Sequence, residues 1–166
     1  GLSDPSTWHN SPPKTARDFY SDAYALCYTG KCSDPQKAIE YLDSAIKMKP
    51  DYAEAFHNRG IAYYDLGQYE RAIEDYNESI RLNPDEGYAY HNRGNTYNKL
   101  GQYQRAIEDF NEAIRLRPQL TAAYLGRGMN YYKTGNKELY CQDIKKACDL
   151  GSCKESEFAK TKERCK

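Results

Sequence analysis

Cysteine is the residue type with the clearest chemical potential in this 166-residue chain, because its six copies lie only toward the two ends. They are Cys27, Cys32, Cys141, Cys148, Cys153 and Cys165. An even count clustered in this way is typical of disulfides in an oxidising compartment. Buried free thiols and a zinc site are the alternatives, and zinc is disfavoured because the sequence has no Cys-x-x-Cys pair.

Helix geometry narrows the pairing of the six cysteines. Two pairs flank expected turns, one near the start of the chain and one at Gly151. If a helix after Gly151 folds back antiparallel, Cys141 and Cys165 lie roughly 15 and 20 Å from that turn, at 1.5 Å per residue. The expected disulfides are therefore Cys27–Cys32, Cys148–Cys153 and Cys141–Cys165.

Few other residues could act as acids, bases or metal ligands. His57 and His91 lie 34 residues apart, and a metal shared between them would need a third ligand. We interpret them as surface histidines that recur with a repeat. The acidic pairs Glu74–Asp75 and Glu108–Asp109 recur at the same step, which is typical of a solvated helix face. Motifs of metalloproteases, serine hydrolases and phosphate-binding loops are absent, so we expect no enzyme activity, cofactor or metal.

These residues recur because the whole sequence repeats every 34 residues. The step is clearest in a glycine, an aromatic residue and a terminal proline: Gly60, Gly94, Gly128, Tyr63, Tyr97, Tyr131, Pro50, Pro84 and Pro118. Each period contains two segments with apolar or small residues at helical spacing, 53–66 and 69–82 in the best example. Gly67 separates them, at a position where left-handed backbone favours glycine. Gly60 and Ala72 are expected where two helices cross closely.

This pattern resembles the tetratricopeptide repeat family, which has a small residue at position eight, an aromatic at eleven, alanine at twenty and a terminal proline. The resemblance implies an all-α fold, a right-handed α-solenoid of tandem helix-turn-helix repeats with a C-terminal capping helix. Position seven, usually apolar in the family, is arginine here. The expected organisation is a flexible leader at 1–14, a degenerate first repeat at 15–52, repeats at 53–86 and 87–120, a fourth repeat with a degenerate second helix at 121–152, and the capping helix at 153–166.

The terminal repeats depart from the family pattern. In the first, Ala25 and Tyr28 are expected to replace the small residue and the aromatic, provided that the turn carries one extra residue. In the last, Tyr140 stands where the family has alanine, and its larger ring should push the helix pair apart or change its angle.

Members of the family bind ligands mainly through the first helix of each repeat, on the inner face of the superhelix. Carried over position by position, the resemblance implies a partner-binding groove formed by Glu54, His57, Asn58, Ile61, Tyr64, Tyr88, His91, Asn92, Asn95, Asn98, Leu125, Met129 and Tyr132. Asparagine can both donate to and accept from a peptide backbone, and tyrosine offers contact area at little entropy cost. The clamp that holds chaperone C-termini would need cations where Ala122 and Gly126 stand, or Tyr88 and Asn92 if the register starts one repeat earlier, so a chaperone tail is not the expected ligand.

Composition restricts the class of partner. The chain has 24 basic and 24 acidic residues and a net charge of zero, which argues against nucleic acid or an anionic membrane as the main partner. No apolar run has the length of a transmembrane segment. We expect a non-enzymatic scaffold, monomeric or weakly homo-oligomeric, that binds a protein or peptide and is periplasmic or secreted. The alternative is a structural protein that self-assembles through its repeat ends.

Overall fold

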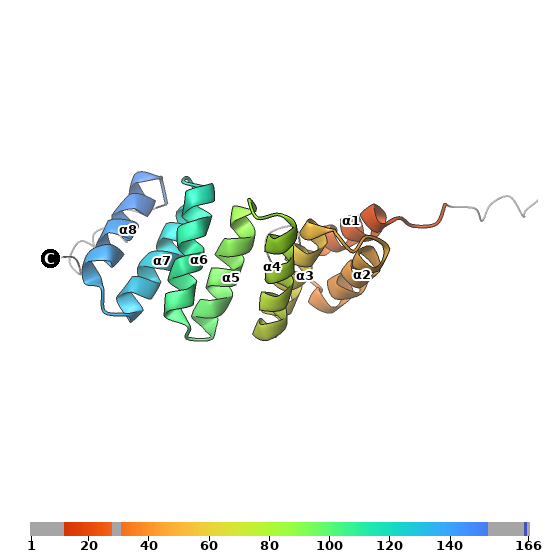
Figure 1. Ribbon diagram of the computed structural model, residues 1–166, viewed down its shortest axis with the longest axis horizontal. Helices are drawn as coiled ribbons and strands as arrows, with labels where there is room; N and C mark the ends of the chain where they lie inside the picture. The colour runs from red at the N-terminus through yellow and green to blue at the C-terminus, as the bar shows by residue number, and fades with distance from the viewer. Residues whose placement is uncertain (1–11, 28–30, 153–164, 166) are drawn as a thin grey trace, which may run out of the picture.

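The computed structural model describes residues 12–27, 31–152 and 165 of the chain. Within these residues the chain forms helices and no strand. The helices are α1 (Ala16–Leu26), α2 (Pro35–Met48), α3 (Ala53–Asp65), α4 (Tyr69–Leu82), α5 (Gly87–Lys99), α6 (Tyr103–Leu116), α7 (Thr121–Lys133) and α8 (Lys137–Asp149). Successive helices pack as antiparallel pairs, and Figure 1 shows the pairs following one another in a single row. This is the all-α solenoid that the repeat predicts.

Local sequence explains where the helices begin and turn. Thr15 and Asp18 form a reciprocal capping box at the start of α1, and Asp34 caps α2 with proline at its first position. The tight turns within the later pairs contain Gly67, Gly101 and Gly135, with φ of 72°, 72° and 82°. This left-handed backbone is the conformation in which glycine costs least.

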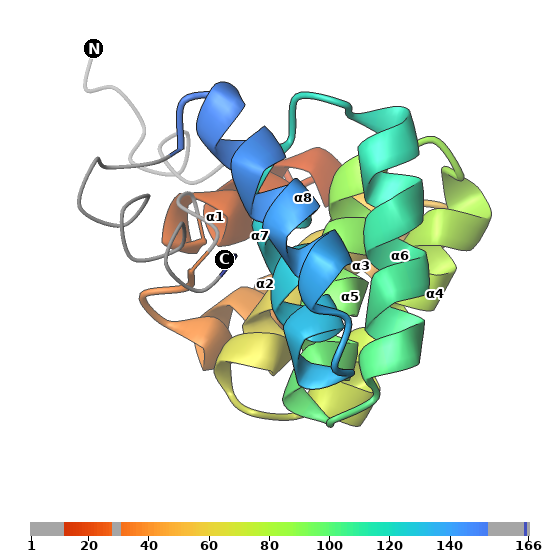
Figure 2. The ribbon, with the colours of Figure 1, turned by 90° about the vertical axis from the view of Figure 1, so that its left-hand side faces the viewer.

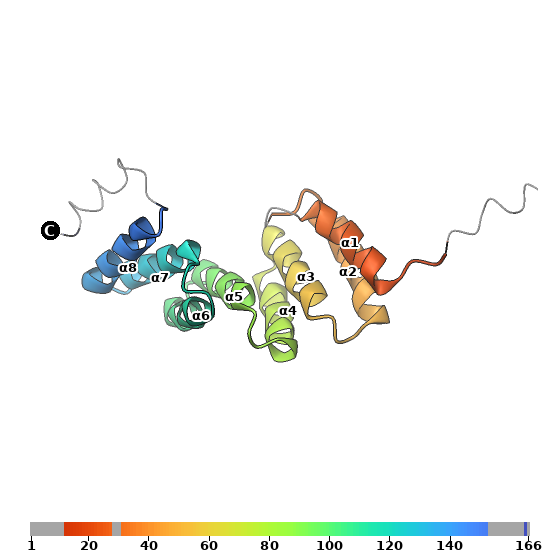
Figure 3. The ribbon, with the colours of Figure 1, turned by 90° about the horizontal axis from the view of Figure 1, so that it is seen from above.

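The pairs form two layers. In Figure 3 the first helices α1, α3, α5 and α7 lie along one side of the row, with α2, α4 and α6 along the other. First helices of consecutive pairs contact one another, whereas in the described residues second helices of neighbouring pairs do not. The closer spacing makes the first-helix side the concave side of the row. Figure 2 views the row from the α8 end.

Small residues allow the two helices of each pair to approach closely. An added Cβ on Gly60 would lie 2.6 Å from Cε1 of Tyr76, and one on Gly94 would lie 3.2 Å from Cε1 of Phe110. Ala72 is fully buried at the α3–α4 crossing. Glycine and alanine are therefore packing residues here, as expected from the repeat.

The first pair differs from its expected register. Ala23 is completely buried, whereas Ala25 is exposed, so Ala23 and not Ala25 fills the small position. The connection from Leu26 to Pro35 has more residues than the later turns, and this changes the sequence spacing between the small position of α1 and the start of α2. The predicted aromatic Tyr28, the capping helix at 153–166 except Cys165, and residues 1–11 of the leader lie outside the described residues.

In the last pair, Tyr140 is buried, 4% exposed, and its ring lies 5.3 Å from that of Tyr132.

Candidate partner-binding face

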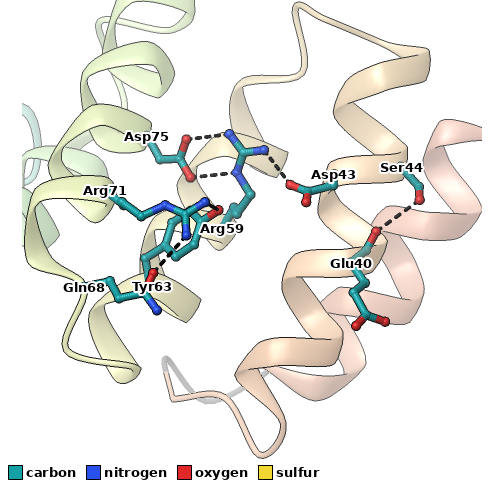
Figure 4. A network of polar contacts seen from close by, with 8 residues as sticks. All are labelled: Glu40, Asp43, Ser44, Arg59, Tyr63, Gln68, Arg71 and Asp75. Carbon is teal, nitrogen blue, oxygen red and sulfur yellow. Dashed lines mark hydrogen bonds and ion pairs between the residues drawn. The ribbon is translucent and has the colours of Figure 1, made fainter.

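An arginine fixes each repeat to the one before it. The Arg59 guanidinium on α3 donates to both carboxylate oxygens of Asp75 on α4, at 2.8 and 2.7 Å. It also donates to Asp43 on α2, the preceding second helix, at 2.6 Å. Figure 4 shows this arrangement, in which one side chain joins three helices. Hereafter we call it the arginine clamp.

The clamp recurs at the next two junctions. Arg93 binds Asp109 of its own repeat and Asn77 of the preceding one. The third clamp has the same form and consists of Arg127, Asp143 and Asn111. Each guanidinium also lies within 6.0 Å of the ring centroids of two aromatic residues on its own helix, a cation–π distance. The clamps set the register in which the first helices stand side by side.

The clamp corrects the interpretation of the recurrent acidic pairs as a solvated face. Glu74 and Glu108 are exposed, but Asp75 and Asp109 are each only 5% exposed and bind arginine. Burial raises the pKa of the Asp109 carboxyl, and the Arg93 hydrogen bonds oppose that rise. The bidentate geometry indicates an ion pair. An arginine and an aspartate that recur together were the sequence signal for it.

A ladder of polar side chains crosses the concave side. Asn92 Nδ2 on α5 lies 2.8 Å from His57 Nε2 on α3. Within α5, Asn95 Nδ2 lies 3.0 Å from His91 Nε2. One repeat earlier, Asn58 donates to the Tyr20 hydroxyl on α1 at 3.2 Å. Sequence reasoning missed Tyr20 because the shifted register of the first pair hid its equivalence to His57.

The two histidines are partly buried, so their interpretation as surface residues is wrong. The His57 ring packs against Tyr76 and the His91 ring against Phe110, with centroids 5.9 and 5.6 Å apart. Burial lowers the pKa of His57. Burial, with a smaller contribution from His57, lowers the pKa of His91 to about 4. Both imidazoles are therefore neutral at pH 7, and each offers one donor and one acceptor nitrogen.

Two recesses are lined in part by residues of the first helices. A small one, about 100 Å³, is lined by Ile61, Tyr64, Tyr76, Asn92 and Asn95. A larger one, about 310 Å³, lies at the turn between α7 and α8 and is lined by Tyr132, Gly135, Lys137 and Tyr140. The smaller recess thus combines the amides of the ladder with tyrosine rings, whereas the larger one is lined by two tyrosines, a glycine and a lysine.

The expected groove residues differ in how much surface they offer. Tyr132, Met129 and Tyr88 are the most open, at 52%, 46% and 44% exposed, and Glu54 is also exposed. The partly buried ones are His57, Tyr64, His91, Asn92, Asn95, Asn98 and Leu125. Asn58 and Ile61 are buried, so they support the face more than they present it.

The ends of the row carry disulfides. Cys27–Cys32 closes the turn after α1, and Cys141–Cys165 ties α8 to the end of the chain. These match two of the three expected pairs. Cys148 is also disulfide-bonded, and Cys153, its expected partner, lies outside the described residues. No cluster of three or more potential metal ligands occurs among the residues that the structure describes.

Paired helices, glycine turns and a concave first-helix face define an α-solenoid of helical repeats. A tetratricopeptide repeat model matches residues 53–86 and 87–120, and a second TPR repeat model matches 34–67. Together the matches span residues 34–120, more than half of the chain. The chain belongs to the tetratricopeptide repeat family.

Solved structures share this architecture. A crystal structure of MamA superposes with a TM-score of 0.75 at 25% identity, over 87% of this chain and 81% of that one. MamA of Desulfovibrio magneticus RS-1 gives a TM-score of 0.74 at 23% identity, over 85% and 78% of the two chains. The TPR domain of Arabidopsis OM64 gives 0.67 at 24% identity, over 72% and 96%.

One curated relative, an uncharacterised protein of Methanocaldococcus jannaschii, is 42% identical over 41 residues. The match covers 25% of this chain and about half of that relative, 48% of its length. Among the described helices, none combines the length and apolarity needed to span a bilayer.

Proposed function

We propose that the chain is a non-enzymatic scaffold that binds an extended peptide segment of a partner protein along α3, α5 and α7. Tetratricopeptide repeat proteins are generally scaffolds for protein–protein interaction, and the family supports that much. The observation that carries the finer proposal is the polar ladder, because its amides are already oriented by bonds to the histidines.

The ladder leaves hydrogen-bonding capacity for a ligand. An asparagine side chain has two N–H donors and one carbonyl oxygen. Asn92 and Asn95 each engage Nδ2 with a histidine, which leaves the second N–H and the oxygen of each amide. A peptide backbone in extended form offers matching donors and acceptors at regular intervals.

The α7 end of the face supplies apolar contact. Met129 and Tyr132 are exposed, and the Tyr132 ring packs at a tilt against that of the buried Tyr140, beside the larger recess. Rigid tyrosine rings bind with little loss of side-chain entropy. The proposed ligand is therefore a peptide whose backbone crosses α5 and whose apolar side chain enters the recess by Tyr132.

The proposal includes an oxidising setting, periplasmic or extracellular. Its support is the disulfides at both ends of the described chain, because such bonds persist where thiols are not kept reduced. Mass spectrometry of non-reduced peptides from the protein purified from its host tests this part. Free thiols at Cys27 and Cys32 would contradict it.

The experiment for the groove uses peptides selected from a random library on the oxidised protein. Calorimetry then compares the best peptide on the wild type, on Asn92→Ala/Asn95→Ala, and on Glu108→Ala as an exposed control on the second-helix side. We expect the double variant to lose about tenfold or more in affinity, since each lost hydrogen bond contributes about 1 kcal/mol. Equal binding by all three proteins would overturn the proposed site.

Self-assembly through the repeat ends is the alternative from the sequence. Light scattering over a wide concentration range distinguishes it, because a stable monomer counts against it.

A further inference from the structure

The two histidine contacts of the ladder share one pairing of atoms, a nitrogen against a nitrogen. Asn92 Nδ2 lies 2.8 Å from His57 Nε2, and Asn95 Nδ2 lies 3.0 Å from His91 Nε2. An amide nitrogen donates hydrogen bonds and does not accept them. Each imidazole therefore accepts at Nε2 and carries its single proton on Nδ1, so this pairing requires the neutral ring.

The surroundings of His57 favour the neutral ring. It packs against Tyr76 of α4, with ring centroids 5.9 Å apart. Burial lowers the pKa of His57, and the opposing effect of two carboxylates, Glu86 just before α5 and Glu54 on α3, is smaller. A proton added at Nε2 would also face the N–H group of the paired amide, which cannot accept it.

The surroundings of His91 act in the same way. Its ring packs against Phe110 of α6, and burial, with a smaller contribution from His57, lowers its pKa to about 4. At the equivalent positions α7 carries Leu125 and Gly126, neither of which titrates. Nδ1 of His91 is buried and has no hydrogen-bond partner among the described residues. His91 is thus uncharged well below pH 6.5, where an ordinary histidine titrates.

The bond to histidine decides which atoms each asparagine offers to a ligand. Because Nδ2 is turned to the imidazole, the side-chain oxygen points away from it. The oxygens of Asn92 and Asn95 have no partner in the described part of the chain, and they are not among its buried unpaired atoms, so both are accessible. Both amides line the smaller recess. The recess therefore offers two acceptor oxygens, each beside a remaining N–H donor.

These groups fit the backbone of an extended peptide. Asn92 and Asn95 are three residues apart on α5, so their Cβ atoms are about 5–6 Å from each other. An extended chain advances about 3.3 Å per residue, so both amides reach one stretch of about two residues. A residue other than proline offers one N–H and one C=O, which match one amide. Proline has no N–H and would leave an amide oxygen without a partner.

We propose that His57 and His91 are positioning residues that hold the two amide oxygens toward the ligand. The concave face thereby selects a peptide with free backbone N–H groups where it crosses α5, and it rejects proline there. This inference rests on the proposed function, because it concerns how the same face chooses its peptide.

A scan of backbone N-methylation tests the selection. The peptide selected on the oxidised protein is made with one methylated backbone nitrogen at a time. Calorimetry compares the series on the wild type, on His57→Leu/His91→Leu and on His57→Gln/His91→Gln. Leucine already stands at the equivalent position of the fourth repeat, Leu125. Glutamine has an oxygen that can accept from Nδ2 without titrating.

We expect one or two peptide residues at which methylation weakens binding to the wild type and to the glutamine variant about tenfold or more, since an acceptor is left unpaired. On the leucine variant the amides are free to rotate, so the same methylation should weaken binding by only about threefold or less, from a lower starting affinity. A wild type that tolerates methylation at every residue would overturn the proposal.

The pH profile gives a readout that packing alone would not move. With a selected peptide free of Asp, Glu and His, wild-type affinity should be constant from pH 8 to about 5.5, where an exposed histidine would already be mostly protonated. It should fall about twofold or more at pH 4, where His91 is half protonated. The glutamine variant should fall less, with circular dichroism confirming the fold at each pH. Equal falls in both proteins would contradict the proposal.

The variant Asn92→Ala/Asn95→Ala separates this inference from the proposed function. If it binds as the wild type does, the proposed site fails and this inference fails with it. If it loses binding while the leucine variant matches the wild type over the whole methylated series, the amides bind without help from the histidines, and only this inference is overturned. If the leucine variant does not fold, His57→Leu alone takes its place, with the same two outcomes.

Discussion

Replacing Asp109 with alanine removes the carboxylate that neutralises Arg93 at the junction of the second and third repeats. Two hydrogen bonds of 2.8 and 2.7 Å are lost, and only the bond of 2.6 Å from Arg93 to Asn77 remains. The side chains are 19% and 7% exposed, so the stranded guanidinium is largely shielded from water.

The size of the effect follows from burial. Removing one partner of a buried ion pair costs about 3–5 kcal/mol, because the other charge stays buried without compensation. Arg93 keeps some exposure and its bond to Asn77, so we expect about 2–4 kcal/mol for Asp109→Ala. Replacing both partners with leucine removes both charges and should cost less than either single change.

Urea unfolding at pH 7 measures these free energies. The set is wild type, Asp109→Ala, Arg93→Leu, Arg93→Leu/Asp109→Leu, and Glu108→Ala as an exposed neighbour that should change stability by less than about 0.5 kcal/mol. If Asp109→Ala costs less than about 1 kcal/mol, the value of a surface pair, the clamp does not hold the repeats as described.

Three further predictions concern packing, pH and disulfides. Ala72→Leu should overpack the α3–α4 crossing and cost about 1–3 kcal/mol in urea unfolding, whereas Glu74→Leu should cost little; equal effects would contradict the buried position of Ala72. Folding lowers the pKa of His57 and His91, so below about pH 6.5 the unfolded chain binds more protons than the folded one. The free energy of unfolding should therefore be at its full value above that pH and fall toward pH 4. A His57→Gln/His91→Gln variant whose unfolding free energy shows the same pH dependence would refute this. A disulfide that closes a longer loop stabilises more, so loss of Cys141–Cys165, with a sequence separation of 24, should lower the free energy of unfolding by about 3.5 kcal/mol. Loss of Cys27–Cys32, with a separation of 5, should lower it by about 2 kcal/mol. In calorimetric melting of the two double alanine variants, the one without Cys141–Cys165 should therefore melt at the lower temperature.

The regular repeats could be predicted from the sequence because local signals and packing agree there. Gly67 and Gly101 mark turns that need left-handed backbone, and Gly60 and Ala72 mark close approaches of helices. Each of these requirements is satisfied by one residue type at one position. The spacing of 34 residues then assigns the same structure to every copy.

Departures from the regular repeat could not be predicted in the same way. The register of α1 depends on the length of an irregular turn, so Ala25 was expected where Ala23 is buried. The burial of Asp75 depends on Arg59, sixteen residues away, and an acidic pair read along one helix looks like a solvated surface. The histidines appeared exposed because their covering rings, such as Tyr76, belong to another helix.

The central claim, a partner-binding concave face, is tested most directly by mapping amide chemical shifts of the oxidised protein as a selected peptide is added. The account predicts shifts concentrated on α3, α5 and α7, around Tyr88, Asn92, Asn95 and Tyr132. Shifts concentrated on α2, α4 and α6 would contradict it.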